Sequence, residues 1–286
     1  MNKRSYRGYA LAALLSAVAV TILRIFVSLF YTEAYTGVYV RDALLPTVLT
    51  VSSALLIAVF SVTGYFIQKK RPFTYKSSGT RIDVIASAFV GFMCFAVSAF
   101  LILDMMLKKS YTIALIVIAA SGILSGFYYV AGIFAGERRR GVFALLAIFP
   151  MLLNVSLLVE LYFDSTILIS CPNRYYNQLA YVAVMFFLLA EMRNAVGGNA
   201  KIYIPSAAVA GSLLAVSSIP NLAVYLLSGS LFPKLMPAQG ATDRPIIYAL
   251  ELAFAIYAFM RLFTLCRTDR GNAEYEEDPT EFIKNN

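Results

Sequence analysis

The stretch from Tyr9 to Tyr31 reads YALAALLSAVAVTILRIFVSLFY, and its single charged residue is Arg24. An α-helix of about 20 apolar residues is long enough to cross the hydrocarbon core of a bilayer. Comparable runs recur along the chain, and none alternates between apolar and polar residues as a barrel strand would. Because a backbone in lipid must satisfy its own hydrogen bonds, these runs predict an all-α, polytopic transmembrane helical bundle.

About eight spans are predicted in a single domain covering residues 1–266. The chain is 60% hydrophobic and 14% charged, whereas soluble domains are about 45–50% apolar and about 25% charged. The remaining residues, 267–286, are polar and acidic, and we expect a disordered cytoplasmic tail. The predicted spans are 9–31, 44–67, 82–107, 111–134, 141–163, 175–196, 202–227 and 246–266.

The distribution of Lys and Arg predicts the orientation. Sixteen of these residues lie on one side of the predicted spans and six on the other, which places both termini in the cytoplasm. The composition suggests a bacterial cytoplasmic membrane by analogy. One alternative stays open: Lys3, Arg4 and Arg7, with the apolar run to Val20, also fit a cleaved signal peptide, whose removal would leave seven spans in the same orientation.

Several chemistries are excluded by missing residues. Histidine is absent, so histidine-ligated haem, HExxH zinc sites and Ser-His catalysis are ruled out. No phosphate-binding loop or dinucleotide fingerprint occurs. We therefore expect no catalytic residue, no metal and no cofactor. The basic residues form short clusters between apolar segments and indicate topology, not nucleic-acid binding. Cys94, Cys171 and Cys266 are predicted at different membrane depths, so no disulfide is expected.

Tyrosine, small residues and proline predict how the spans are arranged. Tryptophan is absent, so tyrosines near span ends are expected to form the interfacial belt. Small residues spaced four apart predict close packing of spans 111–134 and 202–227 inside the bundle, whereas span 246–266, rich in Phe, Leu and Ile, is expected to face lipid. Pro150 and Pro220 are expected to kink their helices. The packing residues are Gly122, Gly126, Gly132, Gly136, Ala207, Gly211 and Ala215. The belt residues are Tyr9, Tyr31, Tyr65, Tyr111, Tyr162, Tyr175, Tyr176, Tyr203 and Tyr248.

Ionisable residues inside predicted spans are candidates for a functional site, because a charge in lipid is costly. Arg24, Glu160 and Glu251 fall at similar depths in the outer half of the membrane, to within about one helical turn of about 5.4 Å. One interpretation is a polar pocket in which Arg24 holds an anionic group, or the carboxylates take a cation or proton. The other is a structural ion pair or snorkelling to the interface. Snorkelling is expected for Glu191 and Arg261, near the cytoplasmic ends.

Three classes of function remain open. The first is a transporter or permease component for a small solute or ion, because little of the chain is predicted outside the bilayer. The second is a non-catalytic scaffold or signalling partner that binds another protein through its acidic C-terminal tail. The third, an enzyme acting on lipid through the cluster from Glu137 to Arg140, is ranked last, because that cluster fits a topology signal better.

Overall fold

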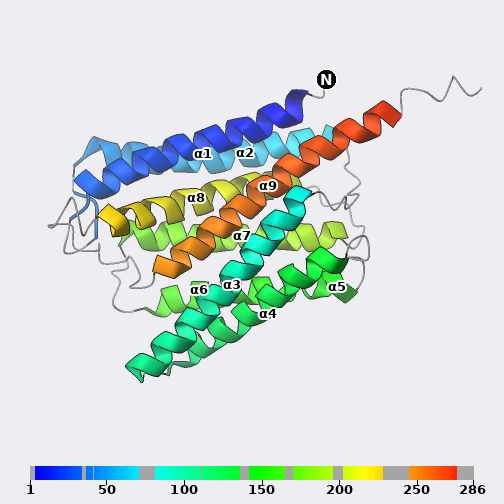
Figure 1. Cartoon of the computed structure of the whole chain (residues 1–286). Helices are drawn as coiled ribbons and strands as arrows, with labels where there is room; N and C mark the ends of the chain where they lie inside the picture. The colour runs from blue at the N-terminus through cyan, green and yellow to red at the C-terminus, as the bar shows by residue number, and fades with distance from the viewer. Residues whose placement is uncertain are drawn as a thin grey trace, which may run out of the picture.

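The computed structural model describes residues 4–33, 37–40, 42–70, 81–109, 111–135, 142–164, 170–195, 202–227 and 245–275. Within these ranges the protein is an all-α bundle of eight long helices and one short one (Figure 1). The helices are α1 (Arg4–Phe30), α2 (Leu44–Lys70), α3 (Arg81–Lys108), α4 (Ile113–Ala135), α5 (Val142–Leu145), α6 (Ile148–Phe163), α7 (Pro172–Ala195), α8 (Tyr203–Leu227) and α9 (Pro245–Tyr275).

Six of these helices are long and apolar enough to cross a membrane: α1, α2, α3, α4, α8 and α9. The molecule has an apolar exterior, with side chains such as Leu15, Phe92 and Leu107 more than half exposed, while polar residues such as Arg24 and Glu251 are buried. A water-soluble protein shows the reverse arrangement of charged groups. The chain is therefore a membrane protein.

The other two predicted spans differ from these six. Helix α6 has only 16 residues, and α7 is long but carries several Asn, Arg and Glu residues. Both lie in the bundle, α6 beside α4 and α7, and α7 beside α8. The count of eight spans remains a prediction for this pair. Successive long helices run in alternating directions, so α1 begins on the side of the bundle where α9 ends (Figure 1).

Helix α8 lies at the centre of the bundle. It packs against α1, α2, α7 and α9 (Figure 1), and most of its side chains are buried. Ala207 and Ala215 are buried, and the backbone at Gly211 approaches the ring of Phe259 so closely that a Cβ would lie 3.0 Å from it. Small residues thus allow α9 to pack directly on α8.

Helix α4 packs on α3 through glycine but has one face exposed. A Cβ at Gly122 would overlap the Ser98 hydroxyl, and one at Gly126 would lie 2.7 Å from the Phe95 ring. The opposite face carries exposed residues such as Phe134. Helix α4 therefore lies at the edge of the bundle, and the expectation that its span lies inside the bundle is wrong. Gly132 is buried, and Gly136 lies outside the described residues.

The expectation that the last span faces lipid is wrong. Most of its α9 segment is buried against α8, α3 and α1. Its large apolar side chains fill the spaces that small residues leave on its neighbours, as Phe259 does over Gly211. Helix α9 also continues to Tyr275, past the predicted end at Cys266, and the tail beyond Tyr275 lies outside the described residues.

The two prolines have different local consequences. The predicted span 141–163 is interrupted between α5 and α6, just before Pro150, which occupies the first turn of α6. A proline there lacks only an N–H that would have no helical partner. Pro220, in contrast, lies inside α8, which continues through it. The carbonyl four residues earlier, that of Val216, consequently loses its helical donor.

Eight of the nine tyrosines expected at the interface fall into two groups, and the ninth, Tyr31, is half-buried. Tyr65, Tyr111, Tyr162 and Tyr175 are exposed, as belt residues should be. The belt assignment is wrong for a second group, whose rings are buried among helices, because a position near a helix end does not say which way the side chain points. The buried members are Tyr9, Tyr176, Tyr203 and Tyr248.

Candidate functional site: a buried arginine beside a polar cavity

Arg24 is completely buried, with 0% of its surface exposed. It projects from α1 into the bundle, where its guanidinium meets α7 and α8. Burying a charge costs several kcal/mol unless hydrogen bonds and an opposite charge compensate it. The surroundings of Arg24 therefore decide what this residue can do.

One partner of Arg24 is a backbone carbonyl that Pro220 leaves free. Nη1 of Arg24 donates a hydrogen bond to the carbonyl oxygen of Val216. In an uninterrupted helix that oxygen would accept from the N–H of residue 220, but proline has none. The guanidinium thus replaces the missing helical donor, and this explains how α8 accommodates a proline in its buried interior.

The other partners of Arg24 come from the first turns of α7. Nη2 donates to Oδ1 of Asn173 at 2.7 Å. The guanidinium also lies over the Tyr176 ring, with its central carbon 4.0 Å from the ring centroid, which is a cation–π distance. The Tyr176 hydroxyl lies 3.1 Å from the Ser53 hydroxyl of α2. Helices α7 and α8 therefore hold the guanidinium in place, while its Nε has no hydrogen-bond partner among the described residues.

The segment after α1 covers this site. Backbone hydrogen bonds from Glu33 to Val38 and from Val40 to Tyr31 fold it back on itself. Gly37 has φ 66°, a left-handed conformation that favours glycine. The fold brings the half-buried Tyr39 side chain beside Arg24. Burial raises the pKa of the Tyr39 hydroxyl, and the Arg24 charge opposes that shift.

Cys171 fastens this covering segment to α7. Its thiol donates to the Gly37 carbonyl at 3.5 Å, and its sulfur accepts backbone N–H groups from the first turn of α7. Cys171 is fully buried. Neither Cys94 nor Cys171 forms a disulfide, and the side chain of Cys266 lies outside the described part of the chain.

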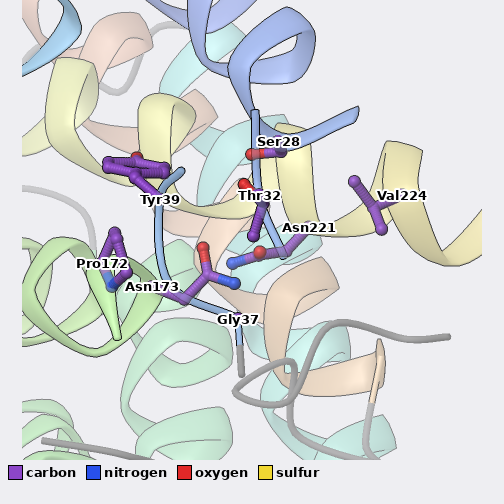
Figure 2. Close-up of a pocket in the computed structure, with 8 residues that line it drawn as sticks. All are labelled: Ser28, Thr32, Gly37, Tyr39, Pro172, Asn173, Asn221 and Val224. Atoms are coloured by element: carbon purple, nitrogen blue, oxygen red, sulfur yellow. The ribbon is translucent and has the colours of Figure 1, made fainter. Parts of the chain in front are cut away.

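A small cavity is lined in part by the covering segment (Figure 2). Arg24 does not line it but hydrogen-bonds Asn173, which does. The cavity volume of about 10 Å³ is room for about one water molecule. Because Oδ1 of Asn173 accepts from Arg24, the Asn173 amide N–H groups remain available to a ligand. Asn221 uses its own N–H for the Ser217 carbonyl. The lining residues are Ser28, Thr32, Gly37, Tyr39, Pro172, Asn173, Asn221 and Val224.

Glu251 belongs to a second polar network, which includes Ser217 of α8. It lies on α9 and is 1% exposed. Its carboxyl accepts from the Tyr181 hydroxyl of α7 at 2.6 Å and lies 3.1 Å from the Ser217 hydroxyl. The Ser217 hydroxyl also hydrogen-bonds Oδ1 of Asn177. This network continues from the Arg24 site, because Ser217 directly follows Val216.

The structure places the three predicted charges differently from the sequence-based expectation of an ion pair. Among the described residues, Arg24 forms an ion pair with neither Glu160 nor Glu251. That part of the interpretation is wrong, because Arg24 finds a carbonyl and an amide oxygen instead. Glu251 is close enough for its charge to interact with Arg24. Glu160 is half-buried on α6 and interacts electrostatically with Tyr181.

The prediction that Glu191 and Arg261 snorkel is wrong as well. Both are buried, and Arg261 Nε donates to the Glu191 carboxylate at 2.8 Å. Tyr257 donates to the same oxygen at 2.8 Å, and Asp83 lies 3.3 Å from Arg261. This cluster joins α3, α7 and α9 near the ends predicted to be cytoplasmic. Charges that find partners inside a bundle need not reach the interface.

Sequence reasoning missed much of this site, although α7 contained a signal for it. Asn173, Asn177 and Tyr181 follow one another at intervals of four and therefore share one helix face. The structure directs that face toward Arg24, Ser217 and Glu251. A polar stripe on a helix of transmembrane length indicates a polar interior.

Comparison of the chain with protein-family models, curated proteins and solved structures found no match.

Proposed function

We propose that this membrane protein transports a small solute, and that Arg24 and the adjoining cavity bind its anionic group. The observation that carries the proposal is a completely buried guanidinium that forms no ion pair among the described residues. A buried cation hydrogen-bonded only to neutral oxygens retains an uncompensated positive charge. An anion in the cavity beside it would supply the missing negative charge.

The groups around the cavity support an anion over a cation. The Asn173 amide offers N–H donors, and Ser28 and Tyr39 contribute hydroxyls (Figure 2). Donors and a neighbouring guanidinium favour negative charge, whereas a cation site needs converging oxygens with negative charge. The small volume limits the part that enters the cavity to a monatomic ion or to one oxygen of a group such as a carboxylate.

The location of the site supports transport over a purely structural role. Its residues come from α1, α7 and α8, and the covering segment contributes to the lining of the cavity. Farther along α7 and α9, the Glu191–Arg261–Asp83 cluster holds the helices together. Passage of a solute bound among these helices would need them to move, as alternating access requires.

The test is stabilisation of the purified protein by probe anions. Chloride, nitrate and formate are titrated as salts of one cation, and thermal unfolding is followed. A ligand at 100 times its dissociation constant stabilises the folded state by about 2.7 kcal/mol. We expect saturable stabilisation of the wild type and of Arg174→Gln, and none of Arg24→Gln.

Arg174 is the matched control because it is another buried arginine whose guanidinium binds a backbone carbonyl, that of Tyr162. Its guanidinium binds this carbonyl on α6, whereas that of Arg24 binds Asn173, a residue that lines the cavity. Anions that bind should then enter proteoliposomes containing the wild type but not those containing Arg24→Gln. Equal stabilisation of wild type and Arg24→Gln by every anion would refute the site.

A further inference from the structure

We infer that Glu251 is a proton-binding site coupled to the Arg24 site, so that a proton and an anion bind together. This inference rests on the proposed function. It starts from the isolation of the Glu251 carboxyl, which is 1% exposed and whose hydrogen-bond partners are the Tyr181 and Ser217 hydroxyls. A buried carboxyl with only neutral partners is stable when it holds a proton.

The hydrogen bonds around Ser217 account for where that proton sits. The Ser217 hydroxyl has one proton but contacts two oxygens, Oδ1 of Asn177 and Oε2 of Glu251. With a proton on Oε2, Glu251 donates to the Ser217 oxygen, and Ser217 donates to Asn177. Each oxygen in this series of hydrogen bonds, from Glu251 through Ser217 to Asn177, then faces a donor. A carboxylate would instead compete with Asn177 for one hydroxyl proton.

The connection to Arg24 runs through α8. Arg24 binds the Val216 carbonyl, Ser217 follows it, and Asn221 links the Ser217 carbonyl to the cavity. The Arg24 charge also acts directly on Glu251. With the cavity empty, that charge favours the carboxylate. An anion beside Arg24 cancels this effect, so anion binding favours a proton on Oε2, and a proton there favours the anion equally.

Other charged groups near Glu251 do not replace Arg24 in this coupling. Tyr181 of α7 donates to Glu251, and Glu160 of α6 and Tyr248 of α9 interact with Tyr181. Helix α8 contributes the Ser217 hydroxyl. On α3, Asp104 is paired with Lys108 at 2.9 Å. Arg24 is the cation whose charge acts on Glu251.

The coupling predicts the charge that is moved. One proton from water is taken up on Oε2 for each anion bound, and both leave on the other side. Transport of a monovalent anion is then electroneutral and acidifies the compartment it enters. In Glu251→Gln the amide cannot take up the proton, so any remaining anion movement carries net charge.

The experiment measures protonation and anion binding separately in the full-length protein. Infrared difference spectra are recorded on adding chloride, nitrate or formate to the wild type, Glu251→Gln and Asp104→Asn. We expect a band of a protonated carboxylic acid to appear with the anion in wild type and Asp104→Asn, and to be absent from Glu251→Gln. In weakly buffered solution, the wild type should take up one proton per anion, a readout that needs no variant.

The pH dependence of affinity completes the test. Coupling to one proton weakens anion binding by up to about tenfold per pH unit where the proton is released, and Glu251→Gln should remove this dependence. Arg24-dependent anion binding without proton uptake overturns the inference but leaves the proposed function standing. A protonated-acid band that is already complete without anion also overturns the coupling. Absence of any anion binding overturns both.

Discussion

Replacement of Pro220 by alanine should stabilise the protein more when Arg24 is absent than when it is present. The reason is the Val216 carbonyl, which accepts a hydrogen bond from Arg24 in place of the N–H that proline lacks. Pro220→Ala restores that N–H. In the wild type this oxygen already accepts from Arg24, so the restored N–H adds only a second bond to a satisfied acceptor. In Arg24→Met the restored N–H satisfies an oxygen otherwise left unpaired in the buried interior.

The magnitude follows from the single hydrogen bond involved. A hydrogen bond from a charged group contributes about 1.5–3 kcal/mol, and an unsatisfied buried acceptor costs about 1–3 kcal/mol. The double-mutant cycle should therefore show a coupling of about 2 kcal/mol between the two positions. Any change in strain around the proline ring occurs in both backgrounds and cancels in the cycle.

The assay is SDS-induced unfolding in mixed micelles, followed by tyrosine fluorescence because the chain has no tryptophan. The matched control is the same cycle with Arg174→Met, since Arg174 binds the Tyr162 carbonyl on a different helix. That cycle should be additive. A coupling between Arg24 and Pro220 below about 0.5 kcal/mol, the usual limit of additivity, would refute the proposed replacement of the helical donor.

Three further predictions concern packing, charge and reactivity. Arg261→Met removes the guanidinium that contacts the buried Glu191 and Asp83 and should lower the free energy of unfolding by about 3–5 kcal/mol. Arg193→Met, at an exposed position of α7, should change it little, and similar losses would contradict the ion pair. Gly126→Ala should destabilise the protein by about 1–3 kcal/mol, because the new Cβ would lie 2.7 Å from the Phe95 ring. Gly8→Ala should not, because nothing lies within 4 Å of its Cβ, and equal effects in the same assay would contradict the close approach of α3 and α4. Burial raises the pKa of the Cys171 thiol, so the midpoint of its alkylation rate against pH should lie above that of an exposed cysteine introduced by Tyr111→Cys, and a midpoint at or below the control would count against that burial.

The candidate site was predictable in its charges but not in their partners. The cost of a charge in lipid singled out Arg24 and Glu251. Both are buried, and they are close enough to interact electrostatically. An ion pair was the expected compensation. Depth along a helix axis, however, says nothing about rotation around that axis, and rotation decides which side chains meet. The same uncertainty explains why Tyr176 was expected at the interface and is found beneath Arg24.

The Glu191–Arg261–Asp83 cluster shows a second reason why the structure differs from the sequence-based prediction. Glu191 and Arg261 are 70 positions apart in sequence, and Asp83 lies on a third helix. Near a helix end, water and a buried partner are both within reach of a long side chain. Which one the side chain takes depends on whether neighbouring helices bring a counter-charge there. The length and hydropathy of single helices carry no information about that.

Apolar runs of sufficient length determined by themselves that this chain is helical and lies in a membrane, because lipid leaves the backbone no other way to satisfy its hydrogen bonds. Tertiary structure alone decided which polar groups share the interior. The Val216 carbonyl illustrates the physical reason: it becomes available through Pro220 on α8, and only the packing of α1 against α8 brings Arg24 to it.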